Sequence, residues 1–143
     1  MLYIINSISD PYFDLVKQDP VRPGIPFERR IGPCRCIFVL VESDIPLAVT
    51  CVSLQNSIPT KEEELFLDNQ NAEVAVFYTI WNIQPGSASS LLNQTLKYIK
   101  QEKPKIKRFL TLSPKTDMAR RFHIRNGARV LSENTNSINY EYS

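Results

Sequence analysis

The sequence predicts an α/β (α+β) fold: one domain over residues 1–143, with helices on both faces of a central mixed sheet. Two observations carry this prediction. The β-rich run Val74–Trp81 leads through a small-residue turn into Ala88–Lys100, where apolar residues recur with helical spacing. Earlier in the chain, Cys36–Val41 and Leu47–Leu54 form a predicted hairpin. It is hydrophobic almost throughout, as strands covered on both faces are.

Composition and charge are those of an ordinary globular domain. Hydrophobic residues make up 43% of the chain, and a formal net charge of +2 argues against a dedicated nucleic-acid-binding protein. No apolar run is long enough to span a membrane and the N-terminus has no signal-peptide pattern, so we expect a cytoplasmic protein without membrane contact. The three cysteines and the single histidine form no metal-ligand pattern, so we expect reduced thiols and no metal.

The first part of the chain is expected to be less regular. Asp10 is a predicted N-cap and Pro11 a predicted first helical residue, for a short helix that ends near Gln18. Several prolines mark Asp19–Pro33 as a loop. Its basic tail, Arg29–Gly32, is either solvated or supplies a charge to a ligand or partner.

The remaining elements follow from turn and capping signals. The acidic run Glu62–Glu64 is expected on a solvated surface turn or short helix. Thr116 is expected to cap a helix that ends near Asn126, with Met118 and Phe122 on its buried side. The other predicted strands are Leu2–Asn6, Arg108–Leu112, Ala128–Ser132 and Ile138–Tyr142.

The turn between the central strand and its helix has the properties of an anion site. Gly86, Ser87 and Ala88 carry little side chain, so a ligand can approach the backbone closely. The free N–H groups of a helix start also favour negative charge. The alternative is an ordinary joint between a strand and a helix.

Three residues are candidates for chemistry. Ser113 follows a predicted strand, at the edge where ligand crevices form in open α/β sheets. His123 lies on the next helix, and its ordinary pKa of about 6.5 suits proton donation near neutral pH. Tyr142 lies at the end of the last strand. Each also has a purely structural interpretation. Ser113 can be part of a turn, His123 a surface or core residue of its helix, and Tyr142 a packing residue.

The turn resembles the pyrophosphate motif of the acyl-CoA N-acyltransferase (GNAT) fold, Arg/Gln-x-x-Gly-x-Gly/Ala. Gly86-Ser87-Ala88 matches its second half, whereas Ile83 takes the Arg/Gln position and Gln84 is one residue away. This resemblance implies a GNAT-like acyl-CoA-binding domain with a mostly antiparallel sheet.

A closer resemblance is to malonyl-CoA decarboxylase, whose catalytic domain has the GNAT fold. It covers the chain from about Arg29 to the end. The stretches that carry it, in the family's order, are Arg29–Pro33, Pro46–Val49, Phe77–Ile80, Thr111–Pro114, Phe122–Ala128 and Asn139–Tyr142.

The resemblance implies a site and a substrate. It places the family's catalytic dyad on Ser113 and His123, and a further active-site residue on Tyr142. It implies a coenzyme A thioester as substrate, no metal or organic cofactor, a possible homodimer, and a role in fatty acid metabolism. The family's acidic residue after the CoA-binding loop has no counterpart here, nor has its N-terminal helical domain within these residues. The residues expected to bind CoA are Thr79, Ile80, Trp81, Gln84, Gly86, Ser87, Ala88 and Ser89.

The expected function is therefore conversion of malonyl-CoA to acetyl-CoA and carbon dioxide through an enolate, with the roles of Ser113 and His123 interchangeable. Two alternatives stay open. One is an N-acyltransferase that uses acetyl-CoA. The other is a CoA-binding module without catalytic activity.

Overall fold

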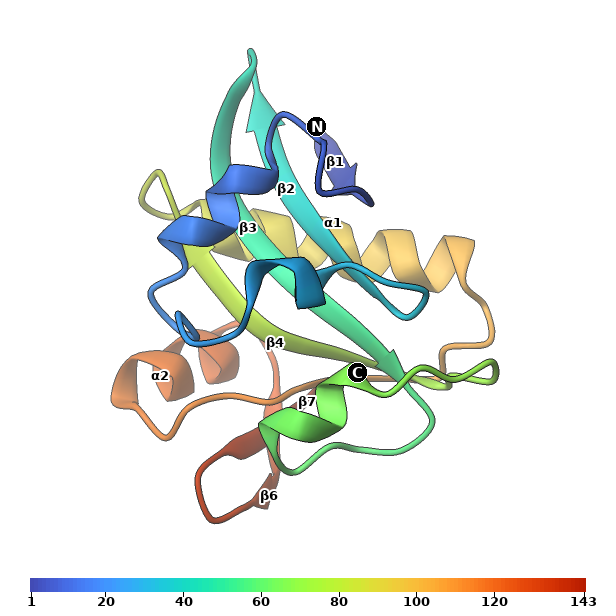
Figure 1. The fold of residues 1–143 in the computed structure, drawn as a ribbon. Coiled ribbons are helices and arrows are strands. Elements are labelled where there is room, and N and C mark those ends of the chain that lie inside the picture. Colours follow the sequence, from blue (N-terminus) through green and yellow to red (C-terminus); the bar gives the residue numbers. More distant parts are fainter.

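The computed structural model describes residues 1–143 and contains seven strands, two α-helices and three 3-10 helices (Figure 1). In chain order these are β1 (Leu2–Ile5), η1 (Phe13–Gln18), η2 (Phe27–Arg30), β2 (Arg35–Glu42), β3 (Ile45–Gln55), η3 (Glu62–Phe66), β4 (Val74–Asn82), α1 (Ser87–Glu102), β5 (Arg108–Thr111), α2 (Asp117–Arg125), β6 (Arg129–Glu133) and β7 (Ile138–Tyr142).

All seven strands form one sheet in the order β1-β2-β3-β4-β5-β7-β6. Only β4 and β5 run parallel, and every other neighbouring pair is antiparallel. A parallel pair needs a crossover connection, which α1 supplies. The predicted mixed, mostly antiparallel sheet is confirmed.

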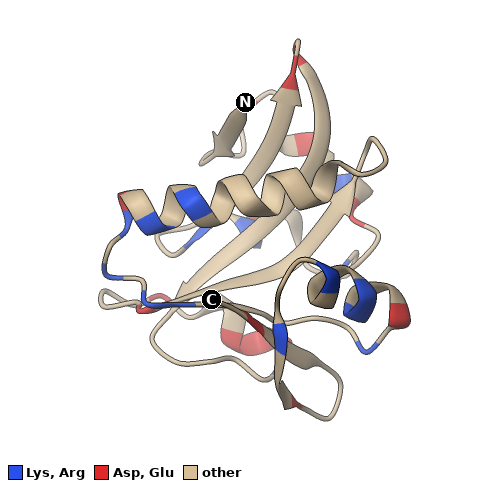
Figure 2. Cartoon of the chain, turned by 180° about the vertical axis from the view of Figure 1, so that it is seen from behind, with Lys and Arg blue, Asp and Glu red and all other residues tan.

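The sheet is covered on both sides, as predicted, but by different kinds of helix. Both α-helices lie on one face, which Figures 1 and 2 show from opposite sides. There Leu91 and Leu92 of α1 are buried against the sheet. The 3-10 helices cover the other face, where Phe13 of η1 and Leu65 of η3 join a second core cluster. Buried residues along the central strands therefore point alternately into one core and the other.

β4 and β5 diverge part-way along their length. Their pairing runs from Val74–Arg108 to Phe77–Thr111. The next residue, Tyr78, has no partner on β3, because the register shifts there by one residue. Such a bulge bends its strand. Beyond it β4 pairs only with β3, while the chain after β5 bridges to Ile138 at the start of β7. We call the opening between β4 and the end of β5 the fork.

The side chain of Arg22 lies across the fork. Its Nε donates to the carbonyl of Tyr78 at 2.8 Å and its Nη2 to the carbonyl of Leu112 at 2.6 Å. One planar guanidinium thus connects two strands that no longer pair with each other.

A buried ion pair holds the segment that carries Arg22. Arg30 Nη1 donates to a carboxylate oxygen of Asp19 at 2.6 Å, and both side chains are fully buried. Asp19 also accepts from the Thr79 hydroxyl at 2.8 Å and from the backbone N–H of Val21 at 2.7 Å. Arg30 donates further to the Arg22 carbonyl at 2.8 Å. These bonds compensate for removing two charges from water.

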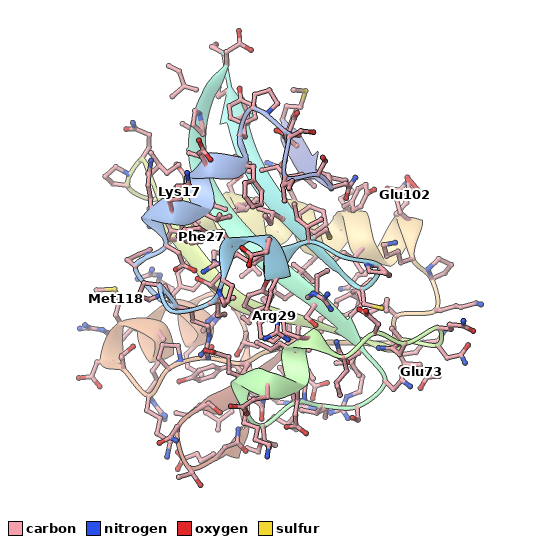
Figure 3. The ribbon with its side chains drawn as sticks, viewed as in Figure 1. Lys17, Phe27, Arg29, Glu73, Glu102 and Met118 are labelled. Carbon is pink, nitrogen blue, oxygen red and sulfur yellow. The ribbon has the colours of Figure 1, made fainter.

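Two sequence-based expectations change. The basic tail is not wholly solvated, because Arg30 is paired inside the protein. Arg29 is exposed, with its guanidinium 4.2 Å from the centre of the Phe66 ring (Figure 3). The helix expected from Asp10 begins only at Phe13 and is a 3-10 helix, because the Asp10 carboxylate accepts from the N–H of Tyr12 in a local turn.

We expect Arg30→Met to lower the free energy of unfolding by about 3 kcal/mol or more, because it leaves the Asp19 charge buried without its partner. Chemical denaturation measures this. The matched control is Asp14→Asn, which breaks the exposed pair with Lys17 and is expected to cost less than about 1 kcal/mol. Equal effects of the two changes would show that the buried pair has no special importance.

Candidate active site

The start of α1 offers backbone N–H groups at the end of β4. Gly86 precedes the helix with a φ of 82°, a left-handed conformation that glycine adopts without strain. The Ser87 amide donates to the Gln84 carbonyl at 3.3 Å, and the Ala88 amide to the Asn82 side chain at 2.7 Å. The amides of Gly86 and Ser89 make no hydrogen bond, so these two of the predicted phosphate-binding residues have an unused donor.

The helix α2 brings His123 to the sheet. Thr116 caps it as predicted, its hydroxyl accepting from the Ala119 amide at 3.2 Å. The expected buried side of this helix was partly wrong, because Met118 is 78% exposed and points outward (Figure 3), whereas His123 is only 4% exposed.

His123 and Tyr142 are joined by a hydrogen bond of 2.6 Å between Nδ1 and the phenol oxygen. The imidazole also stacks on Tyr140, with ring centres 5.1 Å apart. Burial lowers the pKa of His123 to about 4 and raises the pKa of Tyr142. Both groups are therefore neutral at pH 7. The expectation that His123 titrates near neutral pH is wrong, because the sequence does not reveal this desolvation.

Ser113 lies on the same face of the sheet as His123. Its hydroxyl donates to the Thr111 hydroxyl at 2.7 Å, so these alternate residues share a face. No hydrogen bond joins Ser113 to His123. The register places Ser113 opposite Ile138, four residues before Tyr142 on β7, which corresponds to roughly 13 Å along the strand. The structure brings His123 and Tyr142 together and leaves Ser113 at the fork.

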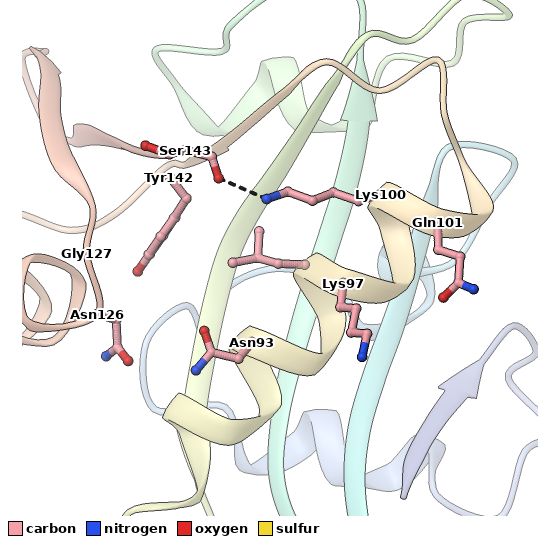
Figure 4. A pocket seen from close by; sticks show the side chains of 9 residues that line it. Asn93, Lys97, Lys100, Gln101, Asn126, Gly127, Tyr142 and Ser143 are labelled. Carbon is pink, nitrogen blue, oxygen red and sulfur yellow. Dashed lines mark hydrogen bonds between the residues drawn. The ribbon is translucent and has the colours of Figure 1, made fainter.

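A groove of about 750 Å³ opens beside Tyr142, between α1 and the ends of α2 and β7 (Figure 4). Of its lining residues, only Tyr142 was predicted from the sequence as a site residue. Asn93, Lys97 and Lys100 recur every three to four residues, but any solvent-facing helix has such a polar stripe, so the sequence does not distinguish a groove wall. The lining residues are Asn93, Leu96, Lys97, Lys100, Gln101, Asn126, Gly127, Tyr142 and Ser143.

The charges around the groove are basic. Lys and Arg lie on the second half of α1 and along α2, while the first half of α1 carries none (Figure 2). Lys100 Nζ donates to the backbone oxygen of Ser143 at 2.9 Å.

No cluster of three His, Cys, Asp or Glu side chains is arranged to hold a metal ion. Burial raises the pKa of Cys36 and Cys51 to about 12, so neither supplies a thiolate. Neither α-helix combines the length and the apolar character needed to cross a membrane.

A family model, the malonyl-CoA decarboxylase C-terminal domain, matches residues 26–137. The chain belongs to this family. The match includes the Asn82–Ser89 turn, Ser113 and His123, and ends before Tyr142. No curated protein matches the chain.

Solved structures agree with the family. Malonyl-CoA decarboxylase from Agrobacterium vitis is 27% identical with a TM-score of 0.70, over 89% of this chain and 36% of that one. The enzyme from Rhodopseudomonas palustris is 20% identical with a TM-score of 0.76, over 100% of this chain and 59% of that one. The GNAT domain of S. lividans PAT is 11% identical with a TM-score of 0.70, over 99% of this chain and 88% of that one. The predicted GNAT-like fold is confirmed, and the chain spans less than two thirds of either decarboxylase.

We expect the burial of His123 to make folding pH-dependent. Its folded pKa, about 4, lies below the ordinary value of 6.5, so the unfolded chain takes up a proton first as the pH falls. The neutral His123 contributes fully to the free energy of unfolding above pH 6.5. This contribution is lost progressively toward pH 4, to a total of about 3 kcal/mol. Comparing denaturation of the wild type and His123→Gln across this range isolates the effect, and parallel pH dependences would contradict it.

Proposed function

We propose that this chain binds malonyl-CoA and converts it to acetyl-CoA and carbon dioxide. The observation that carries the proposal is the neutral, buried His123–Tyr142 pair, of which Tyr142 lines a basic groove, in a member of the malonyl-CoA decarboxylase family. Ser113 shares the same sheet face. The similar decarboxylases are longer than this chain, so the activity of the isolated domain is part of what we propose.

Coenzyme A would be held by backbone donors and by the groove. The unused amides of Gly86 and Ser89 lie at the N-terminal, positive end of α1, which favours binding of a pyrophosphate. Gln84 lies in the same turn. The cations of Lys97 and Lys100 suit the remaining negative charge of the nucleotide. The thioester would meet the backbone of Thr79–Trp81, beyond the bulge where β4 has left β5.

The reaction needs an electron sink and a proton. The bond between the α-carbon and the carboxylate carbon breaks, and its electron pair moves to the thioester carbonyl as an enolate. Carbon dioxide then leaves, and one proton is added to the α-carbon. Hydrogen-bond donors at the enolate oxygen lower the barrier because charge develops there. Ser113, at the fork and on the helical face, would supply one such hydroxyl donor.

His123 and Tyr142 form a proton relay in this scheme. In this scheme the Tyr142 hydroxyl donates to Nδ1, so the neutral imidazole carries its proton on Nε2. Nε2 makes no hydrogen bond within the protein and is not among the polar atoms sealed from water. It can give its proton to the α-carbon while Nδ1 takes the Tyr142 proton. Water in the groove then restores the phenol.

An N-acyltransferase is the second candidate, because a neutral imidazole can also accept the proton of an attacking amine. A CoA-binding module without catalysis is the third. The fold of the S. lividans domain is compatible with all three.

We predict that the purified chain forms acetyl-CoA from malonyl-CoA with no amine present. Chromatography of the thioesters measures this. We expect His123→Gln to lower kcat at least 100-fold, because the relay is broken, and Arg121→Gln on the exposed side of α2 to leave it unchanged. Consumption of acetyl-CoA only with added amine would instead show a transferase, and binding without turnover a module. Full activity of His123→Gln would remove it from the mechanism.

A further inference from the structure

The fork holds a cation that the mechanism above does not use. Arg22 donates Nε and Nη2 to the carbonyls of Tyr78 and Leu112, one from each arm of the fork. Leu112 directly precedes Ser113, so the guanidinium lies one residue from the proposed active-site hydroxyl, toward the 3-10 face of the sheet. A guanidinium has five N–H donors, and those on Nη1 face outward from the fork.

Hydrogen bonds to its own backbone fix the position of Arg22. Its backbone N–H donates to the Asp19 carboxylate at 3.1 Å, and its carbonyl accepts from Arg30 at 2.8 Å. The buried Asp19–Arg30 pair thereby binds the main chain of Arg22 through both its N–H and its carbonyl group. An arginine that only covered the surface would not need its backbone held in this way.

A carboxylate already occupies the free side of this guanidinium. Glu62 of η3 accepts from Nη1 at 3.1 Å. The Glu62 side chain is 45% exposed and the Arg22 side chain 13%. An ion pair with one exposed partner contributes little stability, so another carboxylate can displace Glu62 at small cost. Planar guanidinium groups also bind carboxylates in a bidentate geometry that ammonium groups do not offer.

We propose that Arg22 recognises the free carboxylate at the acyl end of the substrate, and that Glu62 is its partner in the empty protein. The ligand class is thioesters of dicarboxylic acids, as opposed to simple acyl thioesters. This inference rests on the proposed function, because it assumes that the acyl end enters the fork from the helical face. Its carboxylate then passes between β4 and the end of β5 to reach Nη1 on the 3-10 face.

The contact is made to a charge that the reaction removes. The carboxylate leaves as neutral carbon dioxide, so its pairing with Arg22 stabilises the bound substrate more than the transition state. Arg22 therefore determines specificity and affinity. Its loss should raise KM for malonyl-CoA without lowering kcat.

Isothermal titration of a non-reactive malonyl-CoA analogue and of acetyl-CoA tests this without turnover. We expect the wild type to bind the malonyl analogue at least tenfold more tightly than acetyl-CoA, and Arg22→Gln to abolish that preference while acetyl-CoA binding stays unchanged. Arg29→Gln, an exposed arginine of η2, should leave both affinities as they are. A wild type that binds neither thioester would overturn the proposed function as well. An undiminished preference in Arg22→Gln would overturn only the role of Arg22.

A second variant leaves Arg22 in place, so it decides the question even if Arg22→Gln fails to fold. Glu62→Gln removes the competing carboxylate and should tighten binding of the malonyl analogue several-fold, with no change for acetyl-CoA. Glu63→Gln, its exposed neighbour, is the matched control. No difference between the two variants would contradict the displacement of Glu62.

Discussion

The architecture of the candidate site depends on one buried ion pair. Asp19 and Arg30 lie only eleven residues apart, yet together they hold the irregular segment between η1 and β2 against the sheet. Removing two charges from water is costly, and the cost is offset here by bonds to Thr79, Val21 and the carbonyl of Arg22. Those bonds attach the segment to β4 at the position where β4 leaves β5.

The fork gives this small domain an opening in its sheet beside the candidate site. A continuous sheet would satisfy its own backbone groups and leave no opening for a substrate. The bulge at Tyr78 bends β4 away from β5. Arg22 donates hydrogen bonds to the carbonyls of Tyr78 and Leu112, which this loss of pairing leaves free. On the helical face, α2 presses His123 onto Tyr140 and Tyr142, and the lost hydration keeps the imidazole neutral. The Arg22 cation and the neutral His123–Tyr142 pair thus lie on opposite faces of the same sheet.

Features encoded locally were predictable from the sequence. The strands, α1 and the Thr116-capped α2 follow from periodicity and capping residues that lie within one segment. The hairpin was also predicted, although its strands extend further than expected to a turn with positive φ at Ser43 and Asp44.

Features that depend on distant partners were not predictable. Nothing in the local sequence distinguishes exposed Arg29 from buried Arg30, because the difference arises from Asp19 and, through it, from Thr79, sixty residues away from that aspartate. For the same reason, neither the lowered pKa of His123 nor the groove beside Tyr142 could be predicted from the sequence. Ser113, His123 and Tyr142 lie on one face of the sheet, but only His123 and Tyr142 are in contact.

A crystal structure with a non-reactive malonyl-CoA analogue tests the central claim most directly. We predict pyrophosphate oxygens on the amides of Gly86 and Ser89, the acyl end between Tyr78 and Leu112, and its carboxylate on Arg22 in place of Glu62. An analogue bound with its acyl end outside the fork, away from both Ser113 and His123, would contradict this arrangement.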